Sequence, residues 1–229
     1  MFKCSIAGAE NLLPTPTAKR PMILTPIPLD RLAGALDRFA AQLDDRAARA
    51  AFARIRATAA ARAEGAAAEA HRDEALALAR RCGMRVHPAG TRSAFNWDGA
   101  ALDGDTDAYV ILHEAAHFVL APPERRILVD FGLGAGPDTT DRAAAYRAAR
   151  LPILEREADE AAASLLGILW EAALGHPALA SFLDQNWLEA LERSAASHFT
   201  AVFRRLRQLG LVEAALTAAE VQPSAREIR

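Results

Sequence analysis

The stretch "AYVILHEAAHFVLAPPERRILVDFG", Ala108–Gly132, contains two histidines and a glutamate in the most apolar window of the middle third of the chain. His113 and His117 are four residues apart, so on a helix both point to one side, with about 5–6 Å between their Cβ atoms. Both imidazoles can therefore reach one cation, and the adjacent Glu114 can reach a metal-bound water or a substrate. The alternative is an ordinary amphipathic helix, but burying three polar groups without partners would cost on the order of several kcal/mol. The HExxH pattern in this apolar setting therefore predicts a metal site.

The composition predicts a mainly α protein. Of its 229 residues, 52% are apolar, many of them alanine, and only 6% are aromatic. Alanine-rich and charge-rich stretches of this kind favour helix. The net charge of −2 gives no basic face for nucleic acid. Cys4 and Cys82 show no ligand-like spacing, and no segment has the apolar length of a signal peptide or a spanning helix. We therefore expect a cytoplasmic protein without a nucleic-acid or membrane partner.

Changes of composition along the chain indicate three regions. Residues 1–28 contain five prolines, which predict an extended arm. Residues 29–83 form an alanine-rich helical region, and residues 84–229 form the metal-binding catalytic region, expected to make one compact domain with 29–83. In the turn-rich segment before the HExxH helix we expect one or two short strands, at 84–87 and 93–97, joined as a hairpin.

Proline and glycine set the expected helix ends. The HExxH helix is predicted to start after Asp105 or Thr106, to run through Leu120 and to end before two prolines. A long helix is predicted from about 141 to 174, with Pro152 as a kink or a boundary between two helices and with a glycine at its end. Later in the chain an apolar helical stripe is expected to be core: Phe199, Val202, Phe203, Leu206 and Leu209.

A third ligand is expected from the acidic segment "LEREADEAAASLLGIL", residues 154–169. Its acids are Glu155, Glu157, Asp159 and Glu160. Taking the apolar stripe from Leu151 to Ala172 as the buried face, Glu155 lies nearest its centre, at about 70°, against about 110° for Asp159 and about 150° for Glu160. Glu155 is therefore the predicted ligand. The pair Glu155/Asp159 also resembles the E-x-x-x-D pattern of the gluzincin metallopeptidases, which implies Asp159 as a partner of a ligand histidine.

The segment from His113 to Gly132 resembles the bacterial elongation factor P hydroxylases. In that family an HExxH is followed at the same spacing by an alanine, two arginines and L-V-D-F-G, and then by a P-D pair, as at Pro137-Asp138. Farther on, "GHP" at 175–177 approximates a G-aromatic-P of the family, although the Lys-Pro-Gln that follows the family's glutamate is absent here. Counting back from "GHP" favours Glu157 or Glu160 as the third ligand, against the helix-face argument.

The resemblance implies roles for individual residues. His113 and His117 would be metal ligands with Glu114 beside the site, and Asp130, Arg125 and Arg126 would support the ligands or contact substrate. It also implies a non-haem iron hydroxylase whose substrate is a lysine of a translation factor.

The ligand types leave two enzyme classes open. Two histidines and a carboxylate with Fe²⁺ leave room for dioxygen and substrate, whereas with Zn²⁺ they hold a hydrolytic water. We favour a hydroxylase with Fe²⁺ acting on a protein or peptide side chain, with a zinc metallopeptidase of gluzincin type as the alternative and a helical binding protein with a structural metal as a third reading. The other histidines show no such constellation: His71, His87, His176 and His198.

Overall fold

The computed structural model describes residues 27–91, 93–188 and 194–216, and this part of the chain is mainly helical, as predicted. The predicted arm, residues 1–28, lies outside it except for its last two residues. No helix in the described ranges is long and apolar enough to cross a membrane. The helices, in chain order, are α1 Leu29–Gln42, α2 Arg46–Arg56, α3 Gly65–Arg81, α4 Ala108–Leu120, α5 Pro123–Arg126, the 3₁₀ helix η1 Val129–Gly132, α6 Arg142–Ala148, α7 Ile153–Leu174, α8 Ala178–Asp184, α9 Ala195–Gln208 and α10 Leu211–Leu216.

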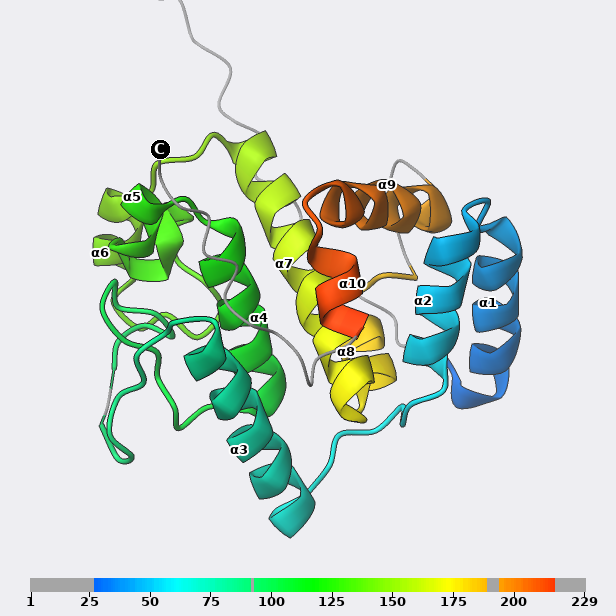
Figure 1. The fold of residues 1–229 in the computed structure, drawn as a ribbon, viewed down its shortest axis with the longest axis horizontal. Coiled ribbons are helices and arrows are strands. Elements are labelled where there is room, and N and C mark those ends of the chain that lie inside the picture. The colour runs from blue at the N-terminus through cyan, green and yellow to red at the C-terminus, as the bar shows by residue number, and fades with distance from the viewer. Residues whose placement is uncertain (1–26, 92, 189–193, 217–229) are drawn as a thin grey trace, which may run out of the picture.

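Helix α7 lies in the middle of the fold (Figure 1), with α4 on one side and α8, α9 and α10 on the other. The HExxH helix α4 is sandwiched between α7 and α3. Gly167 permits the close approach of α7 to α4, because a Cβ added there would lie 3.3 Å from the backbone N of His113. The contact between α4 and α7 therefore involves backbone as well as side chains, and it fixes which residues of α7 face the histidines.

The alanine-rich region divides between two sides of the fold (Figure 1). Helices α1 and α2 pack beside α9 and α8, where four phenylalanine rings contact one another at centroid distances of 4.7–6.2 Å: Phe39, Phe52, Phe182 and Phe199. Helix α3 instead covers α4. The buried apolar side chains of all these helices form one continuous core.

The structure does not confirm the predicted strands before α4. Among the described residues only isolated bridges join Val86 and Trp97 to Leu102. The two segments therefore pair with Leu102 rather than with each other. Asp98 helps to set this turn, because its Oδ1 accepts hydrogen bonds from the backbone N–H groups of Ala100 and Ala101.

Most helix ends lie close to the predicted positions. Helix α4 begins one or two residues later than predicted and ends at Leu120, before the two prolines. Pro152 separates α6 from α7, and Gly175, at φ 77°, ends α7 in the left-handed conformation. Four members of the predicted stripe in α9 are buried, but Leu209 is 42% exposed because it caps the end of the helix.

Candidate metal centre

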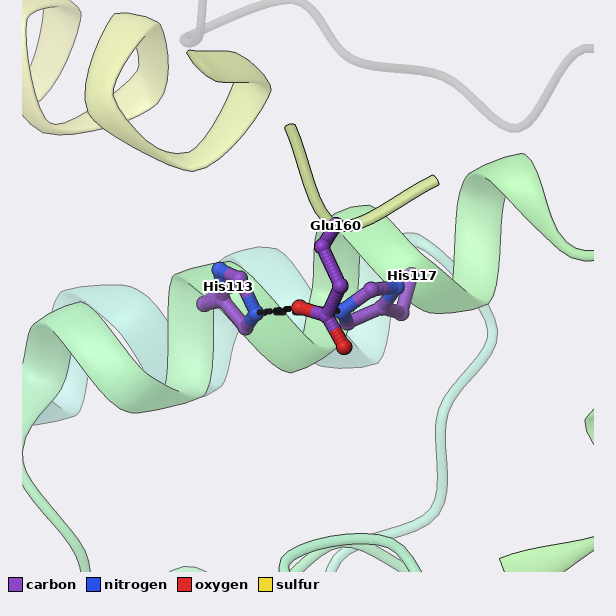
Figure 2. Close-up of side chains that lie close together, drawn as sticks. All are labelled: His113, His117 and Glu160. Carbon is purple, nitrogen blue, oxygen red and sulfur yellow. Dashed lines mark hydrogen bonds and ion pairs between the residues drawn. The ribbon is translucent and has the colours of Figure 1, made fainter. Parts of the chain in front are cut away.

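The two histidines of α4 project from adjacent turns, and their Nε2 atoms lie 3.0 Å apart (Figure 2). His117 is buried, with 3% of its side chain exposed, and His113 is 23% exposed. At least one of two facing neutral Nε2 atoms carries a lone pair that needs a donor or a cation. The pair thus presents two ring nitrogens close together on the same side of one helix.

Helix α7 brings Glu160 to this pair (Figure 2). Glu160 Oε2 lies 3.4 Å from His113 Nε2 and 3.3 Å from His117 Nε2. Ligands about 2.1 Å from one cation lie roughly 3.0–3.4 Å from each other in octahedral or tetrahedral geometry. The three observed separations fall in this range, so His113, His117 and Glu160 could hold a metal ion.

The prediction of Glu155 as third ligand is corrected by this geometry. Glu155 is exposed in the first turn of α7, and Glu160 takes the position assigned to it. The helix-face argument assumed that Leu151 and Leu154 belong to the buried stripe, but Leu154 is 76% exposed and Leu151 precedes the helix. The buried face instead starts at Asp159, rotated away from Glu155. Counting back from "GHP" had kept Glu160 among the candidates.

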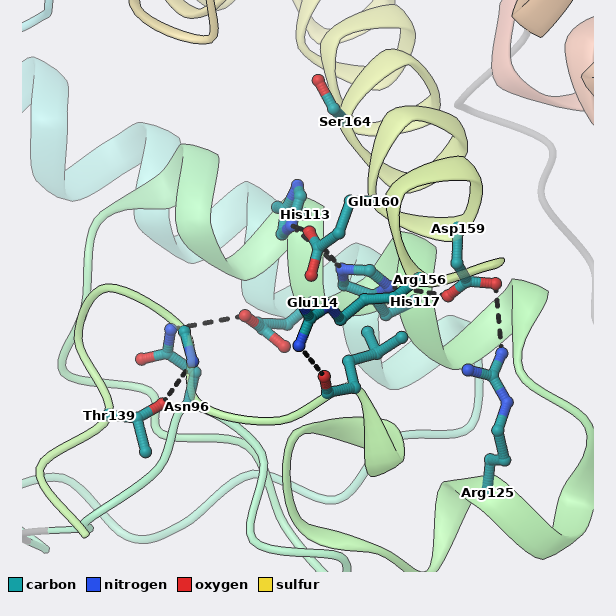
Figure 3. A network of polar contacts seen from close by, with 12 residues as sticks. Asn96, His113, Glu114, His117, Arg125, Thr139, Arg156, Asp159, Glu160 and Ser164 are labelled. Atoms are coloured by element: carbon teal, nitrogen blue, oxygen red, sulfur yellow. Dashed lines mark hydrogen bonds and ion pairs between the residues drawn. The ribbon is translucent and has the colours of Figure 1, made fainter. Parts of the chain in front are cut away.

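Asp159 contacts His117 at Nδ1, on the opposite side of the ring from the candidate ligand atom Nε2, as the resemblance to the gluzincins implied (Figure 3). Its Oδ2 lies 3.3 Å from His117 Nδ1, while its Oδ1 accepts a hydrogen bond of 3.1 Å from Arg125 Nη2. A carboxylate bound to Nδ1–H leaves the Nε2 lone pair free for a metal. Burial opposes ionisation of Asp159, yet His117 and Arg125 hold the pKa of its carboxyl below the usual value.

The charges around the histidines favour a cation. Burial disfavours the imidazolium of His117, but hydrogen bonds to Asp159 and Glu160 outweigh burial and raise its pKa to about 10. Burial likewise opposes ionisation of Glu160, but both histidines lower the pKa of its carboxyl. The surroundings of His117 and Glu160 therefore stabilise positive charge at the histidines. A divalent ion bound there would benefit from the same carboxylates.

Glu114 lies beside the three ligand candidates and is not one of them (Figure 3). It is 8% exposed, and burial raises the pKa of its carboxyl. Asn96 Nδ2 donates a hydrogen bond of 3.3 Å to Glu114 Oε1. Asn96 was missed from the sequence, where it is one polar residue in a turn-rich loop without any distinguishing spacing. This position suits a group that accepts or donates a proton at the site.

Asp130 reaches the site through unusual backbone geometry. Asp130 and Phe131 are consecutive non-glycine residues with φ of 44° and 53°. Such conformations cost on the order of 1–3 kcal/mol each and are found where a site requires them. Here they place the Phe131 ring against His117, with centroids 5.6 Å apart, while Thr139 Oγ1 donates a 2.7 Å hydrogen bond to Asp130 Oδ2. Burial raises the pKa of the Asp130 carboxyl.

The two adjacent arginines have different positions. Arg125 is buried and binds Asp159. Arg126 instead donates from Nε to the carbonyl of Ala121 at 2.8 Å, and its guanidinium lies 4.7 Å from the Phe118 ring centroid. Of the two arginines to which the resemblance assigns a role, only Arg125 is thus connected, through Asp159, to the candidate ligand His117.

A cavity of about 1200 Å³ opens onto the ligand candidates. One wall is the glycine-rich loop after η1, where Arg156 Nη1 donates a 3.2 Å hydrogen bond to the Leu133 carbonyl (Figure 3). The charged side chains of the described wall, apart from the histidines, are all acidic: Glu114, Asp130, Asp138, Glu157 and Glu160. The far wall contains Trp187, which donates to Ser164, and His198, which stacks on Trp187.

The remaining histidines form no ligand group in the part of the chain that the structure describes. His87 pairs with Asp98 at 2.8 Å. His176 is buried, contacts Glu74 at 2.8 Å and stacks on His71.

Comparison with protein-family models, with curated proteins and with solved structures gives no match for this chain.

Proposed function

We propose that this protein is a metal-dependent hydroxylase that uses Fe²⁺ at His113, His117 and Glu160 to oxidise a side chain of a protein or peptide. The observation that carries the proposal is a group of two histidines and one carboxylate at the wall of a large cavity. This ligand set is the one that non-haem Fe²⁺ oxygenases use, because three protein ligands leave positions for dioxygen and substrate. When bound, the iron supplies the activation of dioxygen.

A structural metal is a weaker explanation of the site. Structural zinc sites generally complete four protein ligands. The group found among the described residues has three, and His113 and Glu160 remain partly exposed, with 23% and 46% of their side chains accessible.

A zinc metallopeptidase of gluzincin type is the alternative. It is favoured by Glu114, whose place next to the histidines suits a base for a metal-bound water. A peptide substrate of such an enzyme would pair with an exposed strand edge. Among residues 27–91, 93–188 and 194–216 only isolated bridges occur, so a strand edge of this kind is not described. Because the described residues offer no such strand edge for a peptide, we favour the hydroxylase over the peptidase.

The cavity wall favours a cationic substrate group. Five carboxyl groups line it, whereas no lysine or arginine lines the described wall. Glu114 and Asp130 line the cavity with oxygens that can accept hydrogen bonds from such a group, and Phe131 and Leu133 contribute apolar surface to the same wall. A lysine side chain fits this chemistry, in agreement with the translation-factor substrate that the resemblance implies. We place this reaction in the cytoplasm, where the free thiol of Cys82 would remain reduced.

The test is to identify the metal in protein purified without added metal, and then to load apoprotein anaerobically with Fe²⁺ or with Zn²⁺. Hydroxylation consumes one dioxygen and two electrons and releases one water, so ascorbate is supplied as reductant. We expect the iron form to consume oxygen and add 16 mass units to a lysine-rich peptide pool. Zinc as the resident metal, with chelator-sensitive cleavage of the same peptides, would instead establish the peptidase. His113→Ala is the control that should abolish either activity.

A further inference from the structure

Arg125 is a buried cation whose role is not explained by contact with substrate. It is 8% exposed, and it is not among the residues that line the cavity. Burying a guanidinium is unfavourable unless it is paired. Its one side-chain hydrogen bond in the described structure goes from Nη2 to Asp159 Oδ1, and its Nη1 is buried without a partner. Packing alone does not require a charge at this position, so the role of Arg125 is sought in its contact with Asp159.

The pairing of Arg125 restrains the carboxylate of Asp159. One oxygen of Asp159 contacts Arg125 at 3.1 Å and the other contacts His117 Nδ1 at 3.3 Å (Figure 3). Because both oxygens are engaged, the carboxylate cannot rotate without losing a contact to a buried group. The ring of His117 is consequently held with Nε2 directed at His113 and Glu160.

The turn after α4 explains how an arginine reaches this place. Pro122 and Pro123 end α4 and start the four-residue helix α5, whose Arg125 N–H bonds to the Pro122 carbonyl. The chain thereby turns back, and Arg125 meets α7 one residue before Glu160. Arg125 thus links α5 to the helix that supplies the carboxylate ligand.

We propose that Arg125 is a positioning residue of the metal centre: by holding Asp159 it fixes the orientation and tautomer of His117 for metal binding. This inference rests on the proposed metal site and concerns how tightly that site binds. Groups that orient a ligand histidine typically contribute 10–100-fold to metal affinity. Arg126 has no part in this arrangement, although it is the next residue in the chain.

The test measures Co²⁺ affinity and the visible Co²⁺ absorption band of the full chain at fixed pH. Arg125→Met removes the guanidinium and leaves Asp159 Oδ1 without its donor, whereas Asp159→Asn removes the negative charge and replaces one of the two acceptor oxygens with an amide NH2 group. We expect each variant to weaken Co²⁺ binding by roughly 10–100-fold and to shift the band. The double variant should bind about as weakly as the worse single variant, because both substitutions break one chain of contacts. Arg125→Lys should recover part of the affinity, and Arg126→Met is the matched control that should bind Co²⁺ normally.

Several outcomes would overturn the inference. Wild-type affinity in Arg125→Met, or effects of Arg125→Met and Asp159→Asn that simply add, would show that Arg125 does not act through Asp159. If Arg125→Met does not fold, as judged by circular dichroism, Asp159→Asn decides the matter, because wild-type affinity and an unchanged band in that variant would show that the contact between Arg125 and Asp159 does not position His117. Failure of the wild type itself to bind Co²⁺ would be distinct, and would refute the metal site as well.

Discussion

Asp159 and Glu160 are consecutive residues of α7, yet they contact opposite nitrogens of the same imidazole. Asp159 Oδ2 lies 3.3 Å from Nδ1 of His117, and Glu160 Oε2 lies 3.3 Å from its Nε2. Helix α7 therefore supplies both the candidate ligand and the group that orients the ligand histidine. A small rotation of α7 would change both contacts, which makes the packing of α7 against α4 part of the site.

Glu160→Gln should weaken binding of a divalent metal by more than about 100-fold, because it removes the anionic member of the ligand group found among the described residues. Isothermal titration with Zn²⁺ measures the affinity. Glu155→Gln is the matched control on the same helix, and its affinity should be unchanged because Glu155 is exposed and outside the group. A larger loss of metal affinity in Glu155→Gln than in Glu160→Gln would instead support Glu155 as the third ligand, as the helix-face argument predicted.

Glu114→Gln should retain one metal ion per chain while losing turnover. Glu114 is outside the ligand group, and the glutamine oxygen can still accept the hydrogen bond from Asn96. Metal analysis after dialysis gives the stoichiometry, and oxygen uptake gives turnover. Loss of the metal from this variant would place Glu114 among the ligands.

Gly167→Val should destabilise the fold by about 1–3 kcal/mol, because the added side chain must push apart two packed helix backbones. A Cβ at this position already lies 3.3–3.4 Å from backbone atoms of Leu112 and His113. Metal affinity should fall with stability, since α7 carries Glu160. Chemical denaturation gives the free energy of unfolding.

The control for Gly167 is Gly34→Ala in α1, where an added Cβ meets only the end of the Arg38 side chain, at 3.4 Å. That change should stabilise the protein by up to about 1 kcal/mol, because alanine favours helix. Equal effects at the two glycines would contradict a special role for Gly167.

Glu171→Gln should stabilise the protein more at pH 8 than at pH 5. Burial raises the pKa of the Glu171 carboxyl to about 7, although Ser181 and Arg62 oppose the shift. The folded state therefore binds the proton more tightly than the unfolded state, whose pKa is near the ordinary 4.5. Stability consequently falls as pH rises from about 4.5 to 7, and a neutral glutamine removes this fall. Thermal unfolding of both proteins across this pH range measures the difference, and parallel curves would contradict it.

Much of the local structure could be predicted from the sequence. The HExxH spacing in an apolar run predicted a helix with two histidines on one side, and α4 has them. Pro152 and Gly175 bound α7 as expected, because a missing amide donor and a left-handed residue act within a few positions of themselves. Among the described residues before α4 the expected strands do not form: Val86 and Trp97 make isolated bridges to Leu102, and Asp98 accepts hydrogen bonds within the turn between Trp97 and Leu102.

The composition and spacing of the chain by themselves determined a mainly helical protein with a histidine pair one turn apart and an acidic helix downstream. The tertiary structure decided that Glu160 rather than Glu155 meets that pair, that Asn96 holds Glu114, and that Arg125 reaches Asp159. The physical reason is the separation along the chain over which each effect acts. Helical periodicity is a property of neighbouring residues, whereas the face of α7 that is buried depends on how closely two helices can approach, and Gly167 permits the close approach seen here.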